Sequence, residues 1–220
     1  MVSLAGGWFT GEDMDPADAW SAHYDAPPSL RVLGAFLNSV DERTFGAHHP
    51  HEQFTAPEAL SRWLTAHGLA REGTSAGQAE FADALRLRAT LREAAAANQR
   101  TERPSPETVD LGDVANRLTL RVRVGPGGVE LEPAGGSEVA RALARLAAVA
   151  VLATADGTWQ RVKMCAAPDC RVVFYDGSKP RTGRWCATAV CGNRVKTRRY
   201  RQRVSGAPTD TDTDSAARPG

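Results

Sequence analysis

Residues 165–191 read CAAPDCRVVFYDGSKPRTGRWCATAVC, and this stretch holds all four cysteines of the 220-residue chain. The cysteines form two pairs with the spacing Cys165-x4-Cys170-x15-Cys186-x4-Cys191. Tetrahedral zinc requires four thiolates from two short chelating loops, and a spacer of this length lets the two loops face each other. The sequence therefore predicts one structural Zn²⁺ ion held by the four cysteines.

Two other interpretations of the cysteines are a pair of disulfides and four unrelated buried thiols. The first eight residues lack the basic segment and long apolar run of a signal peptide, and no stretch approaches the roughly 18 apolar residues of a membrane-spanning helix. We therefore expect a cytoplasmic protein without membrane contact, in which thiols stay reduced and clustered cysteines more often bind metal. Four cysteines would close the coordination sphere, so the predicted zinc stabilises the fold and does no chemistry.

Charge is distributed unevenly along the chain. Residues 161–205 contain twelve lysines and arginines but only two acids, Asp169 and Asp176, which gives this segment a formal charge of +10. Because the whole chain carries +1, the remaining residues sum to −9. A strongly basic, metal-held segment attached to an acidic body is typical of a module that binds a polyanion.

The first 153 residues carry mostly helical patterns. The apolar run over 30–40 suits either a buried strand or a buried helix. Thr55-Ala-Pro-Glu58 resembles a capping box, so we expect a helix that starts there and ends at Gly68. A longer helix is predicted over 77–98.

The later part of this region contains the pattern of a hairpin. After a predicted helix over 106–117, apolar and polar residues alternate over 118–124, which indicates a half-buried strand. The glycine-rich turn 125–128 leads to a partner strand that begins at Val129. Residues 138–153 are apolar almost all round and predict a central buried helix.

Three parts of the chain follow from these patterns. Residues 1–153 form one domain, 154–205 form the zinc module, and 206–220 form a low-complexity tail that we expect to be disordered. Within the module, strands over 161–164 and 172–175 predict a hairpin that carries the first cysteine pair. The expected fold class is α+β: a mostly helical domain with a small antiparallel hairpin, followed by a four-cysteine module made of a hairpin and a basic helix.

The zinc segment resembles a known family. It contains Trp185-Cys-x4-Cys-Gly-Asn-Arg194, preceded by Cys-x4-Cys and Phe174-x-Asp176, and this pattern is similar to the CGNR zinc-finger family of bacterial proteins. The resemblance covers most of residues 161–203. It implies that the zinc module binds DNA.

The residues before the finger resemble the domain that usually accompanies it, a stress-induced transcription regulator domain. The motifs that carry this resemblance are Leu37-Asn38-Ser39, Trp63-Leu64…Gly68-Leu69 and Leu85-Arg86…Leu91-Arg92. The resemblance implies a bacterial transcription regulator of the stress response, whose N-terminal domain senses a signal or dimerises.

Three residues near the second cysteine pair are candidates for supporting the metal site. Trp185 precedes a ligand, where it covers the zinc sulfurs or packs in the core of the module. Gly192 follows a ligand, where the backbone passes close to the metal or takes a positive φ. Asn193 is placed to cap backbone donors near the site.

Residues 188–203 favour a helix with Cys191 in an early turn and cations along its length. The predicted nucleic-acid-binding residues are Arg194, Lys196, Arg198, Arg199, Arg201 and Arg203. Such a density of basic side chains can neutralise several phosphates, but an arginine at a phosphate and one at a guanine edge look alike in sequence. The alternatives are a solvated face for the whole run and, for Arg194, a hydrogen bond inside the module.

The sequence contains few other candidates for chemistry. His48, His49 and His51 flank Pro50 in the predicted loop 41–55, but no nearby carboxylate–histidine pattern completes a metal site. The chain has no phosphate-binding glycine loop and no nucleophile-elbow motif. We therefore do not expect an enzyme; the alternative is an enzyme whose pocket lies in the N-terminal domain.

The sequence thus predicts a cytoplasmic, nucleoid-associated regulator that binds DNA through its zinc module. A small-molecule effector of the N-terminal domain and a homodimer are further expectations. The alternative function is a zinc-stabilised module that docks a protein or RNA without sequence-specific DNA binding. For the DNA-binding regulator, Cys186→Ala should remove zinc and DNA binding together, while the N-terminal domain still folds.

Overall fold

The computed structural model describes residues 26–99, 118–126 and 128–205. Two predicted segments, the helix over 106–117 and the disordered tail over 206–220, lie outside these residues. The described part combines helices with small antiparallel sheets, which confirms the α+β fold class. None of the described helices is long and apolar enough to span a membrane.

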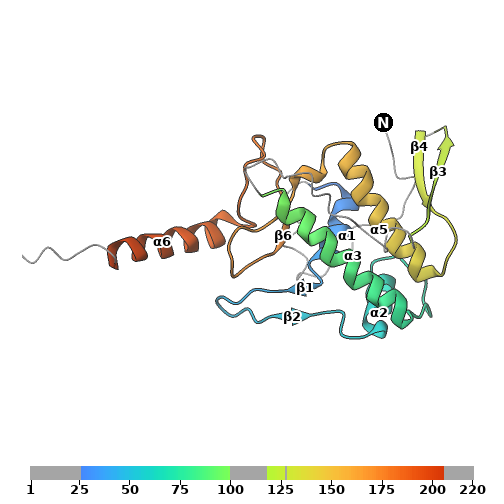
Figure 1. The fold of residues 1–220 in the computed structure, drawn as a ribbon, viewed down its shortest axis with the longest axis horizontal. Helices are drawn as coiled ribbons and strands as arrows, with labels where there is room; N and C mark the ends of the chain where they lie inside the picture. The colour runs from blue at the N-terminus through green and yellow to red at the C-terminus, as the bar shows by residue number, and fades with distance from the viewer. Residues whose placement is uncertain (1–25, 100–117, 127, 206–220) are drawn as a thin grey trace, which may run out of the picture.

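Three helices form the body of the structure. They are α1 (Pro28–Leu37), α3 (Gln78–Ala97) and α5 (Glu138–Ala155), and each packs against the other two (Figure 1). A shorter helix, α2 (Pro57–Ala66), packs against α3 and α5. One hydrophobic core between these helices holds most of the large apolar side chains.

The apolar run over 30–40 forms a helix rather than a strand. Pro28 occupies the first turn of α1, where its fixed φ suits a helix and its missing N–H costs no hydrogen bond. Leu30, Leu33 and Phe36 then recur at helical spacing and are all buried. A strand would send Leu30 and Leu33 to opposite faces, so only the helix buries them together.

The start of α2 differs from the prediction, while its end agrees with it. The N-cap is Ala56 and no side chain caps the helix, so the capping box predicted with Thr55 is wrong. Pro57 in the first turn has no N–H, which leaves fewer backbone donors for a cap to bind. Gly68, whose φ of +65° is typical of a left-handed turn, follows the last turn and ends the helix as expected.

The two long helices have close to the predicted extents. In α3 the Glu80 carboxylate accepts a hydrogen bond from the Gly77 N–H at 2.7 Å, which caps the first turn. In α5 the Ser137 hydroxyl accepts one from the Ala140 N–H at 3.0 Å. Residues along most of α5 are buried, with Val139 fully so, which confirms the predicted central helix.

The strands form three separate antiparallel pairs. These are β1 (Val40–Asp41) with β2 (His51–Glu52), β3 (Leu120–Gly125) with β4 (Gly128–Pro133), and β5 (Val162–Met164) with β6 (Val173–Tyr175). The first pair lies at the base of the segment 41–55, which the sequence predicted as a loop. The other two pairs are the two predicted hairpins.

The β3–β4 hairpin has the predicted pairing but not the predicted burial. Val122 pairs with Leu131 across the hairpin. Val122 is 65% exposed and Val124 is 78% exposed, so the expected half-buried strand is wrong. The physical reason is position: Leu120 at the base packs against the helical core and β4 packs against α5, which leaves Val122 and Val124 of β3 facing solvent.

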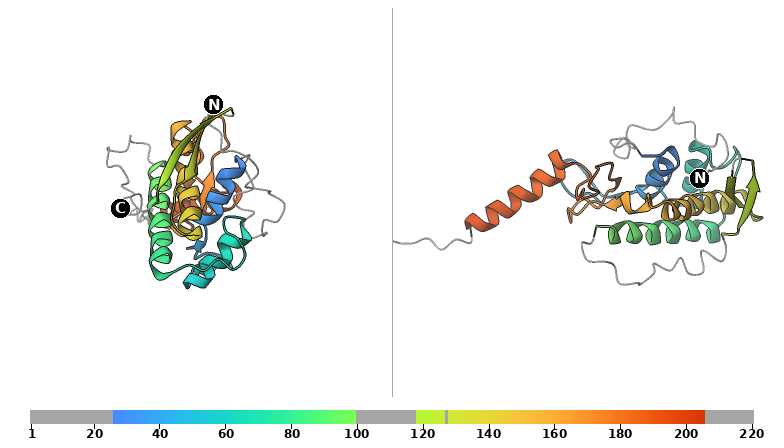
Figure 2. Two further views of the ribbon diagram at one scale, coloured as in Figure 1. Left: turned by 90° about the vertical axis from the view of Figure 1, so that its right-hand side faces the viewer. Right: turned by 90° about the horizontal axis from the view of Figure 1, so that it is seen from above.

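The β5–β6 hairpin is part of the body. β5 packs against α3 and β6 against α1, and Val162, Met164 and Val173 belong to the same core as the helices. Helix α6 (Asn193–Ser205), by contrast, leads away from the body (Figure 2). Core contacts therefore cross the predicted boundary at residues 153 and 154.

Candidate metal centre and basic helix

The four cysteines come together beside the β5–β6 hairpin and the start of α6. All four are buried, and their Sγ atoms lie within 4.8 Å of one another. The Cys186 Sγ atom is 3.6 Å from the Sγ atoms of both Cys170 and Cys191. Zn–S bonds of about 2.3 Å in a tetrahedron place the sulfurs about 3.8 Å apart, so this cluster fits a zinc ion. The thiols are free, and their separations exceed the roughly 2 Å of a disulfide bond.

The sulfurs strongly affect one another's protonation. Hydrogen bonds from Cys170 and Cys186 lower the pKa of the Cys165 thiol, whereas burial raises the pKa of the Cys191 thiol. One thiolate is therefore favoured, but four negative charges in one buried space repel. A bound divalent cation would remove that repulsion, and four sulfur ligands would give it a closed, structural coordination sphere.

Asp169 connects the first cysteine pair to the basic helix. Its Oδ1 atom accepts a hydrogen bond from Arg194 Nη2 at 2.8 Å, and its Oδ2 atom accepts one from Arg198 Nη2 at 2.7 Å. Because these arginines are four residues apart, they lie on one face of α6 and a single carboxylate reaches both. In the sequence, Asp169 stood out only as one of two acids in the basic segment.

Arg194 lies inside the module. Its guanidinium carbon is 3.3 Å from the centroid of the Phe45 ring, and its Nη2 atom is 3.7 Å from the Cys191 Sγ atom. The side chain is only 22% exposed. Its positive charge offsets part of the net −2 that four thiolates and one zinc ion would carry. Of the two roles left open for Arg194, this geometry favours the internal one.

The segment between β1 and β2 also reaches the metal site. The Thr44 N–H donates to the Asp169 carbonyl at 3.1 Å, and Phe45 packs against the cluster of cysteines. The predicted loop 41–55 therefore connects the N-terminal residues with the cysteine module. Phe45 is an apolar residue in an otherwise polar stretch, and this was its only signal in the sequence.

The three residues predicted to support the site have distinct positions. Trp185 is half-buried and packs against the cysteine cluster. A Cβ at Gly192 would lie 3.0 Å from Trp185 Cδ1, and the φ of Gly192 is not positive, so the indole ring is what requires glycine there. The Asn193 Nδ2 atom donates to the Ala189 carbonyl at 3.1 Å, so Asn193 binds a backbone acceptor instead of the expected donors.

The remaining predicted cations of α6 are exposed. Lys196, Arg199, Arg201 and Arg203 lie along the helix, and no carboxylate of the described residues forms an ion pair with them. Arg198 is intermediate, because it binds Asp169 while its side chain stays 48% exposed. The predicted set therefore divides into an anchored pair, Arg194 and Arg198, and four cations that face solvent.

Asn38 holds the zinc hairpin to the helical body. Its Nδ2 atom donates to the Val173 carbonyl at 2.8 Å, and its Oδ1 atom accepts from the Val173 N–H at 2.9 Å. These two bonds resemble those that a neighbouring strand would make with β6. One residue of the Leu37-Asn38-Ser39 motif thus has a direct link to the metal hairpin.

Arg92 of α3 makes a second link. It donates to the Leu37 carbonyl at 2.7 Å and to the Arg171 carbonyl at 3.2 Å, and it forms an ion pair with Glu42. Arg171 directly follows Cys170 of the cysteine cluster and has a φ of 56°. The buried Arg92 side chain therefore fixes the backbone of the first cysteine loop against the helical body.

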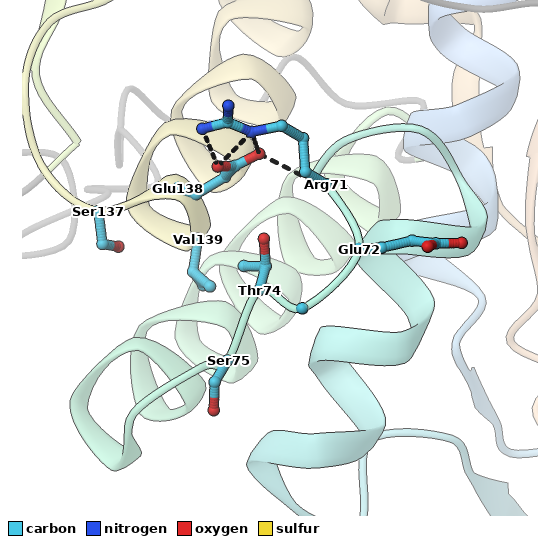
Figure 3. A pocket seen from close by; sticks show the side chains of 8 residues that line it. Arg71, Glu72, Thr74, Ser75, Ser137, Glu138 and Val139 are labelled. Carbon is cyan, nitrogen blue, oxygen red and sulfur yellow. Dashed lines mark hydrogen bonds and ion pairs between the residues drawn. The ribbon is translucent and has the colours of Figure 1, made fainter.

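A polar hollow of about 510 Å³ lies between the loop after α2 and the start of α5 (Figure 3). Its cation, Arg71, already binds the Glu138 carboxylate with Nη2 at 2.8 Å, and these bonds lower the pKa of Glu138 to about 2. Figure 3 shows Glu72 and Ser75 pointing away from this ion pair. The two charged groups at this hollow thus already bind each other. The small-molecule effector remains a prediction.

The histidines of the predicted loop do not form a site. His48 packs edge-on to Phe45, with ring centroids 5.2 Å apart, and His49 and His51 are exposed. In the part of the chain that the structure describes, the four cysteines are the one grouping of three or more side chains suited to a metal ion.

Comparison with known families agrees with this geometry. The family model described as "Putative stress-induced transcription regulator" matches residues 30–158. The model of the CGNR zinc finger matches residues 161–204. Both resemblances expected from the motifs are thereby confirmed, and neither description names an enzyme. No curated protein matches the chain.

Proposed function

The chain belongs to the family described as "Putative stress-induced transcription regulator", and from this premise we propose that it is a DNA-binding regulator whose DNA contacts are made by α6. One zinc ion on the four cysteines would supply the energy that folds the module, as it does in other small zinc-held units. The proposed site of action is the bacterial cytoplasm, at the nucleoid. The N-terminal domain would respond to a signal or dimerise.

The observation that carries this proposal is the division of the cations on α6. Asp169 forms ion pairs with both members of the anchored pair and fixes the start of the helix beside the cysteine cluster. The four solvent-facing cations have no carboxylate partner among the described residues, and α6 leads away from the body (Figure 1). A projecting helix with unpaired cations suits a groove lined by phosphates.

The test uses zinc-loaded full-length protein and fragmented genomic DNA at near-physiological salt. The retained fragments are sequenced. We expect discrete enriched sites, and we expect Arg199→Ala/Arg203→Ala to weaken binding about tenfold or more through lost phosphate or base contacts. A matched control, Arg62→Ala/Arg86→Ala, removes the same charge from exposed positions of α2 and α3 and should bind like the wild type.

A second function, docking of a protein or RNA, is favoured by two exposed apolar residues. Tyr200 is 64% exposed and Val204 is 58% exposed, and they lie one turn apart on α6. Such a pair suits a partner surface as well as a groove. If the protein retains no DNA, or retains all fragments alike and only at low salt, the regulator proposal fails and docking becomes the better explanation.

A further inference from the structure

The loop between the two cysteine pairs carries a second group of cations. Residues 177–184 connect β6 to the second pair, and Lys179, Arg181 and Arg184 are all exposed there. No carboxylate of the described residues pairs with any of the three. Their charges therefore face solvent without compensation.

The one carboxylate at this loop is fully occupied inside it. Asp176 Oδ1 accepts hydrogen bonds from the Ser178 N–H and hydroxyl, at 3.1 and 2.6 Å. Its Oδ2 atom accepts from the Gly183 N–H and from Lys163 Nζ, both at 2.7 Å. Asp176 and Lys163 are 3% and 5% exposed, so their charges cancel beneath the loop.

The same interactions order the backbone of the loop. Lys163 Nζ also donates to the carbonyls of Arg181 and Gly183, at 2.5 and 3.3 Å. Arg161 Nη1 donates to the carbonyls of Asp176 and Ser178, at 2.8 and 2.9 Å. The loop is thus held at both ends and in the middle, which reduces the entropy that it would lose on binding a ligand.

A stack of side chains connects this loop to α6. The Arg184 guanidinium carbon is 5.4 Å from the centroid of a Trp185 ring, and Trp185 packs so closely on Gly192 that a Cβ there would be 3.0 Å away. Gly192 immediately precedes Asn193, the first residue of α6. Figure 2 shows the segment between β6 and α6 gathered at the start of that helix.

We propose that residues 177–184 form a second nucleic-acid contact, in which Lys179, Arg181 and Arg184 bind backbone phosphates beside the groove that α6 enters. This inference rests on the proposed DNA binding of α6. A duplex presents phosphates on both sides of a groove, so a helix in the groove leaves phosphates for a flanking cationic element. Because phosphates carry no sequence information, this contact adds affinity without changing which sites are preferred.

The test measures the salt dependence of DNA affinity for Lys179→Ala/Arg181→Gly. Glycine suits position 181 because Arg181 has a φ of 55°, and this variant leaves Arg184 and its contact with Trp185 intact. Two lost phosphate contacts should flatten the slope of log affinity against log salt by about 1.8. The enriched genomic sites should stay the same, and so should the zinc content. Arg62→Ala/Arg86→Ala, which removes the same charge elsewhere, should keep the wild-type slope.

The outcomes separate the two proposals. If wild-type protein binds DNA and Arg199→Ala/Arg203→Ala weakens it, but the loop variant has the slope of the control, the second contact is excluded and the function of α6 stands. If the wild type shows no salt-dependent DNA binding, both proposals fail. A flattened slope with unchanged site preference and zinc content establishes the loop as a phosphate contact.

Discussion

The two hairpins β3–β4 and β5–β6 have opposite surroundings. Each strand of β3–β4 has six residues, twice the length of the strands in β5–β6, yet the longer hairpin leaves Val122 and Val124 exposed. In the shorter hairpin, Val162 and Val173 are buried in the helical core. Strand length and alternation therefore do not determine burial; what packs on each face does.

The β5–β6 hairpin is buried because both of its faces are covered. Met164 and Val173 are paired across the strands and face α1 and α3. Phe174 and Val172 belong instead to the cluster around the cysteines. Alternation along β6 thus sends successive side chains to the helical core and to the metal site, so this hairpin is a wall shared by both.

The largest effect should come from removing a metal ligand. Cys186→Ser leaves three sulfurs for the metal, so zinc content and DNA retention should both fall to background. Because the hairpin is a shared wall, we also expect the helical body to lose about 3 kcal/mol or more of stability, as measured by urea unfolding. Chelation of zinc from the wild type should reproduce the loss, and zinc addition should reverse it. An unchanged midpoint for the body would instead support the two independent parts expected from the sequence.

A smaller loss of stability is expected from a substitution inside the β5–β6 hairpin. Val173→Ala removes two methyl groups from a residue that is 1% exposed, so we expect about 2 kcal/mol of destabilisation from lost burial and the remaining cavity. The backbone bonds to Asn38 do not involve the side chain and should persist. Urea unfolding with an unchanged m-value would check this; a loss below 0.5 kcal/mol would show that the wall is not shared.

Which features could be predicted from the sequence depends on how far apart in the chain the interacting residues lie. The cluster of four cysteines, the β5–β6 hairpin and the basic helix that follows Cys191 were predictable because chelating pairs and periodic patterns are local in the chain. The bonds of Asn38 to Val173 connect residues 135 positions apart, and no periodicity reports such a contact. The exposed face of β3 was missed for the same reason, since alternation shows which residues share a face but not whether anything covers it.

The anchoring of α6 was missed for a different reason. The sequence shows six cations on successive turns of the predicted helix, but it does not show which of them form an ion pair with a carboxylate. Asp169 takes Arg194 and Arg198 because it lies in the cysteine loop that the metal site brings beside the helix. Folding thus converts a uniform run of charge into an anchored part and a solvent-facing part.

A moderate effect of pH should distinguish the two hairpins. Burial alone would raise the pKa of Asp176, but hydrogen bonds from Lys163, Ser178 and Gly183 outweigh it and hold that pKa at about 2, below the ordinary 3.8. A lowered pKa stabilises the folded state above the ordinary value, and this stability is lost as the pH falls from about 4 to about 2. Acid also releases zinc from thiolates, so the quantity to measure is the difference in stability between the wild type and Asp176→Asn.

That difference should be constant above pH 5 and should shrink on acidification through this window. Glu132 on β4 is the matched control, since Arg121 and Arg123 lower its pKa while their own side chains are exposed, so that solvent screens the charges. Glu132→Gln should follow the wild type closely at every pH. A pH dependence of equal size in both variants would contradict the contrast between a buried and an exposed ion pair.

The smallest effect is expected on β3–β4. Val122→Thr changes a side chain that is 65% exposed and keeps the β-branched shape that suits a strand, so stability should change by less than about 0.5 kcal/mol. Urea unfolding should be repeated at two protein concentrations at least tenfold apart. A loss above 1 kcal/mol that grows with protein concentration would mean that a second copy covers Val122 in solution, because only association makes stability depend on concentration. In that case β3–β4 would be exposed only in the single chain, and this hairpin would form the contact surface of the expected homodimer.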